Sequence, residues 1–168
     1  MRLQRHTTAI RVGLGYLTVA IGLVAVSILI APRSFYENFP TGGWNWVSAL
    51  PPYNEHLIRD FGAASLGLAI LALLAAVWLD RRVVQAAAVA IFAGSLPHAI
   101  YHSTTTEAYS TGSNVASLSA LYLQVLLPVA ILYLATGSRQ RPATGERPER
   151  ARPRWRPRAA RDAPDQLA

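Results

Sequence analysis

Cysteine is absent from the chain, which excludes disulfide bonds, thiolate metal sites and cysteine nucleophiles. Lysine is absent as well, so arginine supplies all 16 basic residues. Together with the abundance of alanine, this favours a GC-rich bacterial genome and indicates no particular catalytic mechanism. Histidine is scarce, because only four of the 168 residues are histidine. Any chemistry that needs imidazole must therefore come from very few positions.

Hydrophobic residues make up 52% of the chain and are concentrated in four blocks. Each block is close to the ~20 residues that a helix needs to cross about 30 Å of hydrocarbon. The pattern predicts an all-α integral membrane four-helix bundle, with helices at about residues 12–31, 56–79, 83–102 and 115–136. The first block is too long for a signal-peptide core and lacks a small-residue cleavage site, so we expect a retained helix.

Charge asymmetry predicts the orientation of this bundle in a cell membrane. If residues 1–11, the turn at residues 80–82 and residues 137–168 lie in the cytoplasm, those segments carry net charges of +3, +1 and +5. The remaining segments then sum to −2. Because basic residues accumulate on the cytoplasmic side, we expect both termini to be cytoplasmic.

Two of the segments that connect the predicted helices indicate how the bundle is arranged. Only Asp80-Arg81-Arg82 joins the second and third predicted helices, which predicts a tight antiparallel hairpin whose open end faces outward. The outer loop at residues 32–54 is rich in Trp, Phe and Tyr, which favour the membrane interface, so we expect it to form a lid on the bilayer surface. Turn residues on either side of residues 44–50 suggest a short helix there.

Residues 137–168 are dominated by Pro, Arg, Gly and Ala, a composition that predicts a disordered basic tail. Nine arginines against four acids favour attraction to anionic lipids, worth about 1 kcal/mol per basic residue near the surface. A solvated tail that only fixes topology is the alternative. Nucleic acid is not expected as a partner, because lipid is the nearer polyanion.

Three of the four histidines fall near the outer ends of the central hairpin. His56 and Asp60 have i, i+4 spacing, as do His98 and His102, so each pair shares one helical face. If the four side chains converge, they offer a tetrahedral set for zinc, and imidazole also suits copper or iron. The alternative is a polar helix boundary in which Arg59 forms an ordinary ion pair with a neighbouring acid.

Residues 54–67, NEHLIRDFGAASLG, and residues 96–102, LPHAIYH, carry a family resemblance. In layout over residues 10–136, the chain resembles the uncharacterised small four-helix membrane proteins of high-GC bacteria and is loosely similar to DoxX-like proteins. DoxX relatives are associated with quinone-linked or thiol-linked redox partners, and the lack of cysteine removes the second association here. The resemblance implies a fold more than an activity.

Two functional hypotheses follow from these features. The first is a multi-pass membrane protein with an accessory or membrane-protein partner-binding role. The second is an outward-facing metal or cofactor site at His56, Asp60, His98 and His102, with redox or hydrolytic activity. Zinc-dependent membrane hydrolases of the ceramidase type use the same ligand types but have seven helices. A transporter is a further alternative, although only Pro97 and Pro128 interrupt the predicted helices.

Overall fold

The computed structural model describes residues 3, 6–41, 43–50 and 52–137. Its regular elements, within this part of the chain, are helices. They are α1 (Thr7–Ile30), α2 (Pro32–Asn38), α3 (Glu55–Trp78), α4 (Arg81–Thr104) and α5 (Thr111–Thr136). The predicted disordered tail falls on residues that lie outside this description, apart from Gly137.

The four long helices contain 24 to 26 residues each and are apolar enough to cross a membrane. Large apolar side chains cover their outer surfaces, and Ile30 and Tyr133 are 79% and 77% exposed. A surface of this kind is stable in hydrocarbon rather than in water. The prediction of an all-α, integral membrane four-helix bundle is thus confirmed.

Side-chain caps fix where three of the long helices begin. The Asn54 side chain accepts a hydrogen bond from the Leu57 N–H (3.1 Å), and the Ser110 hydroxyl accepts one from the Ser113 N–H (3.2 Å). The Asp80 carboxylate accepts from the N–H groups of Arg82 and Val83. Such caps satisfy backbone donors that the first turn leaves free. They explain why α3, α4 and α5 start somewhat earlier than the hydrophobic pattern predicts.

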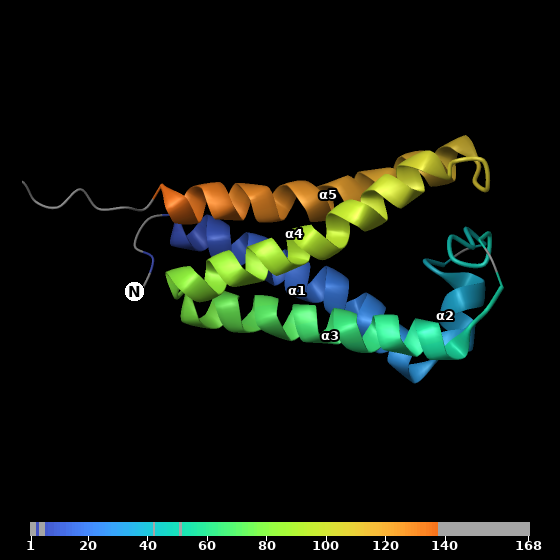
Figure 1. Ribbon diagram of the computed structural model, residues 1–168, viewed down its shortest axis with the longest axis horizontal. Helices are drawn as coiled ribbons and strands as arrows, with labels where there is room; N and C mark the ends of the chain where they lie inside the picture. The colour runs from blue at the N-terminus through green and yellow to red at the C-terminus, as the bar shows by residue number, and fades with distance from the viewer. Residues whose placement is uncertain (1–2, 4–5, 42, 51, 138–168) are drawn as a thin grey trace, which may run out of the picture.

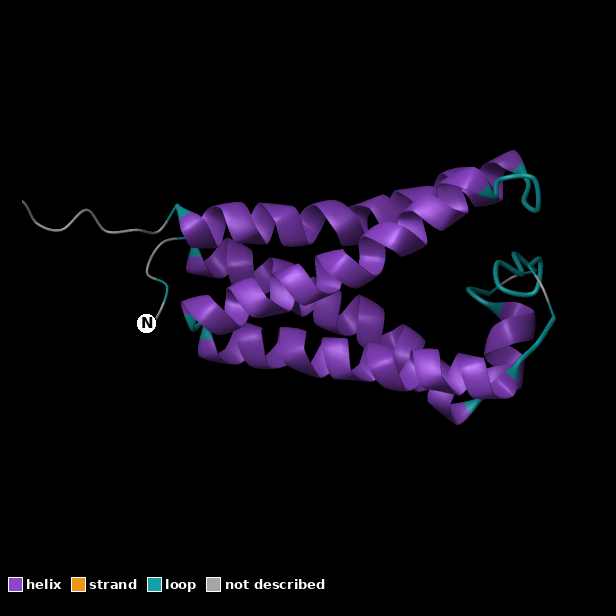
Figure 2. Cartoon of the chain, viewed as in Figure 1, coloured by secondary structure: helices purple, strands orange, loops and turns teal. Residues whose placement is uncertain are grey.

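The long helices form two pairs, α1 with α3 and α4 with α5 (Figure 1). The pairs meet at the end of the bundle where α1 begins and α5 ends, which we call the terminal end. They separate toward the opposite end, which carries α2 and the connections at residues 39–54 and 105–110 and which we call the loop end. Figure 2 shows these connections gathered at the loop end.

The α3–α4 turn is even shorter than predicted, because only Leu79 and Asp80 lie between the two helices. The two helices nevertheless do not stay together, since α4 leans toward α5 (Figure 1). At the terminal end they contribute small buried residues such as Ala75 and Ala87, which allow close approach. Toward the loop end, the rings of Phe61 and His98 lie between them, with centroids 6.2 Å apart.

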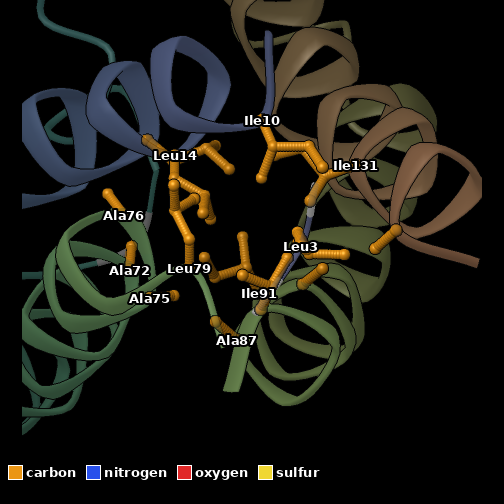
Figure 3. Packing of buried hydrophobic residues seen from close by; sticks show 14 of the residues in the cluster. Leu3, Ile10, Leu14, Ala72, Ala75, Ala76, Leu79, Ala87, Ile91 and Ile131 are labelled. Atoms are coloured by element: carbon orange, nitrogen blue, oxygen red, sulfur yellow. The ribbon is translucent and has the colours of Figure 1, made fainter. Parts of the chain in front are cut away.

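The packed core occupies the terminal end (Figure 3). Leu3 is buried there, and its N–H donates to the Leu79 carbonyl (3.0 Å), so Leu3 covers this end of the bundle. Around Leu3 lie buried side chains from all four long helices, among them Ile10, Leu14, Ala72, Ala75, Ala87, Ile91 and Ile131.

The segment at residues 32–50, which we call the cap, folds over the loop end. Its helix is α2 rather than the predicted one at residues 44–50, where the backbone forms turns. Pro32 occupies the first turn of α2, a position where proline costs no hydrogen bond. Aromatic contacts hold the cap together: the Phe39 ring lies 4.6 Å from that of Phe35 and 5.9 Å from that of Trp46.

Candidate functional site

A cavity of about 520 Å³ lies between the two helix pairs in the loop-end half of the bundle. All four long helices and the cap contribute to its lining. The side chains of the cap at this cavity are Phe35, Phe39, Trp46, Val47 and Leu50. The predicted lid therefore corresponds to a segment whose apolar side chains cover a cavity.

The two walls of the cavity differ in chemistry. The wall built by α1, α3 and the cap is apolar apart from Ser65. The wall built by α4 and α5 carries most of the polar side chains, namely His98, His102, Ser117 and Gln124.

None of the described residues that line the cavity is Asp, Glu or Arg. An ionised group in such surroundings would lose its hydration without gaining a counter-charge, which is costly. The cavity therefore suits molecules that are apolar or polar but uncharged.

His98 and His102 are brought together as the sequence predicted, on one face of α4. Their ring centroids are 4.8 Å apart. His98 lies edge-on to Phe61 of α3, and His102 lies edge-on to Tyr101 (centroids 5.5 Å apart). Both imidazoles thus have an aromatic neighbour.

A hydrogen bond joins the two sides of the loop end. The Tyr109 hydroxyl, in the α4–α5 connection, donates to the backbone carbonyl of Trp46 in the cap (2.6 Å). Burial, with a smaller contribution from nearby Tyr101, raises the pKa of the Tyr109 hydroxyl, so that it stays a neutral donor. The Asn114 side chain donates to the Thr106 carbonyl (2.9 Å) and thereby orders this connection.

Two polar atoms of the cavity-lining residues are buried without a hydrogen-bond partner. They are Nε1 of Trp46 and Nδ1 of His102. Both residues also contact Tyr109, Trp46 through its carbonyl and His102 through its ring (centroids 6.1 Å apart). Nothing in the sequence indicates that Trp46 and Tyr109 meet, because they lie in two different loops, 63 positions apart.

His56 and Asp60 lie elsewhere, on the outer surface of α3. They form a pair with His56 Nε2 3.2 Å from Asp60 Oδ2, and their side chains are 87% and 63% exposed. Arg59 pairs with Glu55 (2.9 Å) and also donates to the Leu29 carbonyl of α1 (3.2 Å). The predicted ion pair of Arg59 with a neighbouring acid is confirmed for Glu55.

The four proposed metal ligands are thus found as two separate pairs. Across the described part of the chain, no three His, Cys, Asp or Glu side chains come close enough to hold a metal ion. The separation follows from the faces of the two helices: His56 and Asp60 lie on the exposed outer surface of α3, whereas Phe61, the residue after Asp60, contacts His98 of α4. A zinc site at His56, Asp60, His98 and His102 stays a prediction. In this structure the four side chains are not close enough together to share one metal ion.

No protein-family model, curated protein or solved structure matches this chain.

Proposed function

We propose that this multi-pass membrane protein binds an uncharged, lipophilic small molecule in the cavity between its two helix pairs. The observation that carries the proposal is the cavity itself, with its volume of about 520 Å³ and its uncharged lining. Ligand sites in proteins commonly have volumes of about 300–1,000 Å³ and combine apolar walls with a few placed polar groups. An accessory or carrier role for a membrane-dissolved molecule fits these properties.

The position of the cavity indicates which half of the bilayer supplies the ligand. By the charge asymmetry of the chain, the terminal end faces the cytoplasm and the loop end faces outward. The cavity then lies in the outer half of the bilayer, between the hydrocarbon midplane and the outer interface. Its ligand would come from the outer leaflet.

Orientation is testable in this cysteine-free chain with single cysteines at the two ends of α5. Thr111→Cys should react with an impermeant maleimide added to intact cells, whereas Gly137→Cys should react only after the cells are opened. Labelling of Gly137→Cys alone in intact cells would reverse the orientation.

Binding is testable by quantifying lipophilic molecules that copurify with the protein in mild detergent. We expect about one specifically retained molecule per chain. Ala120→Phe, which projects a large side chain into the cavity from α5, should abolish retention. Ala130→Phe is the matched control, because Ala130 lies on the same helix, is also exposed and does not line the cavity. Equal retention by the parent and both variants would show that the bound molecules coat the outer surface, and would refute the proposal.

A further inference from the structure

A lipophilic ligand can reach the cavity from the loop end or from the bilayer, through a gap between two helices. At the loop end the cap covers the cavity, and the Tyr109 hydroxyl holds the cap by its hydrogen bond to the Trp46 carbonyl (2.6 Å). Because transfer of apolar surface into water is unfavourable, a ligand dissolved among lipid chains has its more direct route through the side of the bundle. Four helix–helix contacts surround the cavity, and they are not equally closed.

The contacts within the two helix pairs are closed by direct packing in the loop half. Between α1 and α3, a Cβ atom added at Gly62 would lie 2.5 Å from Ile28 Cγ2, so the two backbones approach closely. Between α4 and α5, the hydroxyl groups of Ser103 and Tyr122 form a hydrogen bond (3.0 Å). Entry from the bilayer must therefore occur between the pairs, on one of two sides.

The side between α3 and α4 is bridged at two levels. The Phe61 ring lies edge-on to the ring of His98, with centroids 6.2 Å apart. Deeper along the helices, a Cβ atom added at Gly94 would lie 3.8 Å from Leu68 Cδ1, which is an ordinary contact distance. Phe61 lines the cavity and is also 48% exposed, so its ring separates the cavity from the lipid on this side.

The side between α1 and α5 differs, because these two helices part in the loop half. In the terminal half they pack closely: a Cβ atom added at Gly13 would lie 3.3 Å from Leu127 Cδ1 and 3.2 Å from Ile131 Cδ1. Toward the loop end, α1 leaves α5 and runs to the side of α3 (Figure 1). The two helices are antiparallel, so the same advance of about 10 Å from Gly13 and Leu127 reaches Ala20 on α1 and Ala120 on α5.

Small side chains border the space that opens there. Ala20 and Ala120 both line the cavity, and Ala120 is also exposed. A residue that lines a cavity and is exposed as well lies at the edge of that cavity. A methyl group cannot reach across the gap as the Phe61 ring does on the opposite side.

We infer that the ligand enters the cavity from the bilayer through the gap between α1 and α5, which we call the window, with Ala20 and Ala120 at its two sides. The packing of Gly13 bounds the window toward the terminal end. The hydrogen bond between Trp46 and Tyr109 bounds it toward the loop end, because it joins the cap, which follows α1, to the connection that precedes α5. The inference rests on the proposed function and adds the source of the ligand, which is the hydrocarbon of the bilayer.

A reversible lock on the window tests this route. Protein that keeps Trp46 as its only tryptophan and carries Ala20→Cys and Ala120→Cys is placed in bilayers and loaded with a hexadecanol brominated on its chain, whose binding quenches Trp46. Bifunctional thiol reagents of increasing length, cleavable by a reductant, then bridge the two cysteines. We expect the bridged protein to keep its probe when excess unbrominated hexadecanol is added, and the reductant to restore exchange.

The matched control places the same bridge where the helices already touch. Leu68→Cys and Gly94→Cys join α3 to α4 at residues that do not line the cavity, so bridged and reduced protein should exchange the probe equally fast. A third pair, Phe61→Cys and His98→Cys, tests the opposite side. Loss of exchange on bridging this pair, with unchanged exchange on bridging the window, would place the route between α3 and α4 and overturn the inference.

A second measurement needs no cysteine. Val24 lines the cavity one turn from Ala20 on the same face of α1, so Val24→Ala should widen the window and shift the rate constants for association and dissociation upward together. Val19→Ala makes the same change on the same helix, at a residue that is 59% exposed and does not line the cavity, and should leave both constants unchanged. Faster dissociation alone in Val24→Ala would reveal only a lost wall contact and would count against the window.

Failure of the inference is distinguishable from failure of the proposed function. Equal exchange by the window-bridged and the reduced protein, with saturable quenching in both, would overturn the window and leave binding in the cavity in place. Quenching of Trp46 that does not saturate in the parent would count against both.

Discussion

The terminal and loop halves of this molecule are built from the same four helices yet pack differently. In the terminal half, buried alanines of α3 and α4 let the helices approach, and Leu3 fills the space where they end. In the loop half, the Phe61 ring of α3 contacts the His98 ring of α4, and a cavity takes the place of the core. The comparison shows that one membrane bundle can hold a close-packed core in one half and a cavity in the other.

The largest difference in unfolding free energy should come from replacing one isoleucine by alanine in each half. Ile91 is fully buried in the terminal core, so Ile91→Ala should lower the free energy of unfolding by about 2–5 kcal/mol. Ile58 borders the existing cavity, so Ile58→Ala removes few contacts and should cost less than about 1 kcal/mol. Unfolding in mixed detergent micelles measures both changes, and equal losses would contradict the division into two halves.

A second test concerns the α1–α3 contact, which stays close into the loop half. A Cβ atom added at Gly62 would lie 2.5 Å from Ile28 Cγ2, so Gly62→Ala should destabilise the protein by about 1–3 kcal/mol. A Cβ atom added at Gly67, on the same helix, would have no neighbour within 4 Å. Gly67→Ala should therefore stabilise the protein by about 0.5–1 kcal/mol, because alanine has the higher helix propensity. The two variants should therefore shift the unfolding midpoint in opposite directions.

The membrane helices and the His98–His102 pair could be predicted from sequence, whereas the arrangement of the helices around the cavity could not. Hydrophobic length gave the number and approximate bounds of the membrane helices, because crossing the hydrocarbon sets a minimum length. The i, i+4 spacing correctly predicted that His98 and His102 share a face. Their expected convergence with His56 and Asp60 depended on which face of α3 turns toward α4, which three-dimensional packing determines. The contact between Tyr109 and Trp46 joins residues 63 positions apart that follow no periodic pattern.

A third test sharpens the comparison at the loop end, where the cap meets the α4–α5 connection. Tyr109→Phe removes the hydrogen bond between the α4–α5 connection and the cap while keeping the ring. We expect a modest loss of about 0.5–1.5 kcal/mol in unfolding free energy, as for an ordinary hydrogen bond. Exchange of bound ligand should become faster, because the cap opens more easily. The control is Tyr133→Phe, at an exposed residue of α5 far from the cap. This variant should change neither the unfolding free energy nor the rate of ligand exchange.

The smallest effect is expected at the surface pair of His56 and Asp60. Because both side chains are largely exposed, Asp60→Asn should change the unfolding free energy by no more than about 0.5 kcal/mol. The metal content of protein purified without a histidine tag should be the same in the parent, Asp60→Asn and His98→Ala. A full equivalent of zinc in the parent that is lost in both variants would mean that the four ligands converge in a conformation other than this one.

The most direct test of the central claim, that the loop half holds a ligand cavity, is fluorescence quenching in lipid bilayers. One variant keeps Trp46 as its only tryptophan, at the cavity, and another keeps only Trp78, which is exposed near the terminal end. A hexadecanol brominated on its chain is added in increasing amounts. Trp46 should be quenched along a saturable curve that reaches one ligand per chain, whereas Trp78 should be quenched in proportion to the probe in the bilayer. Proportional, non-saturating quenching of Trp46 would contradict the claim.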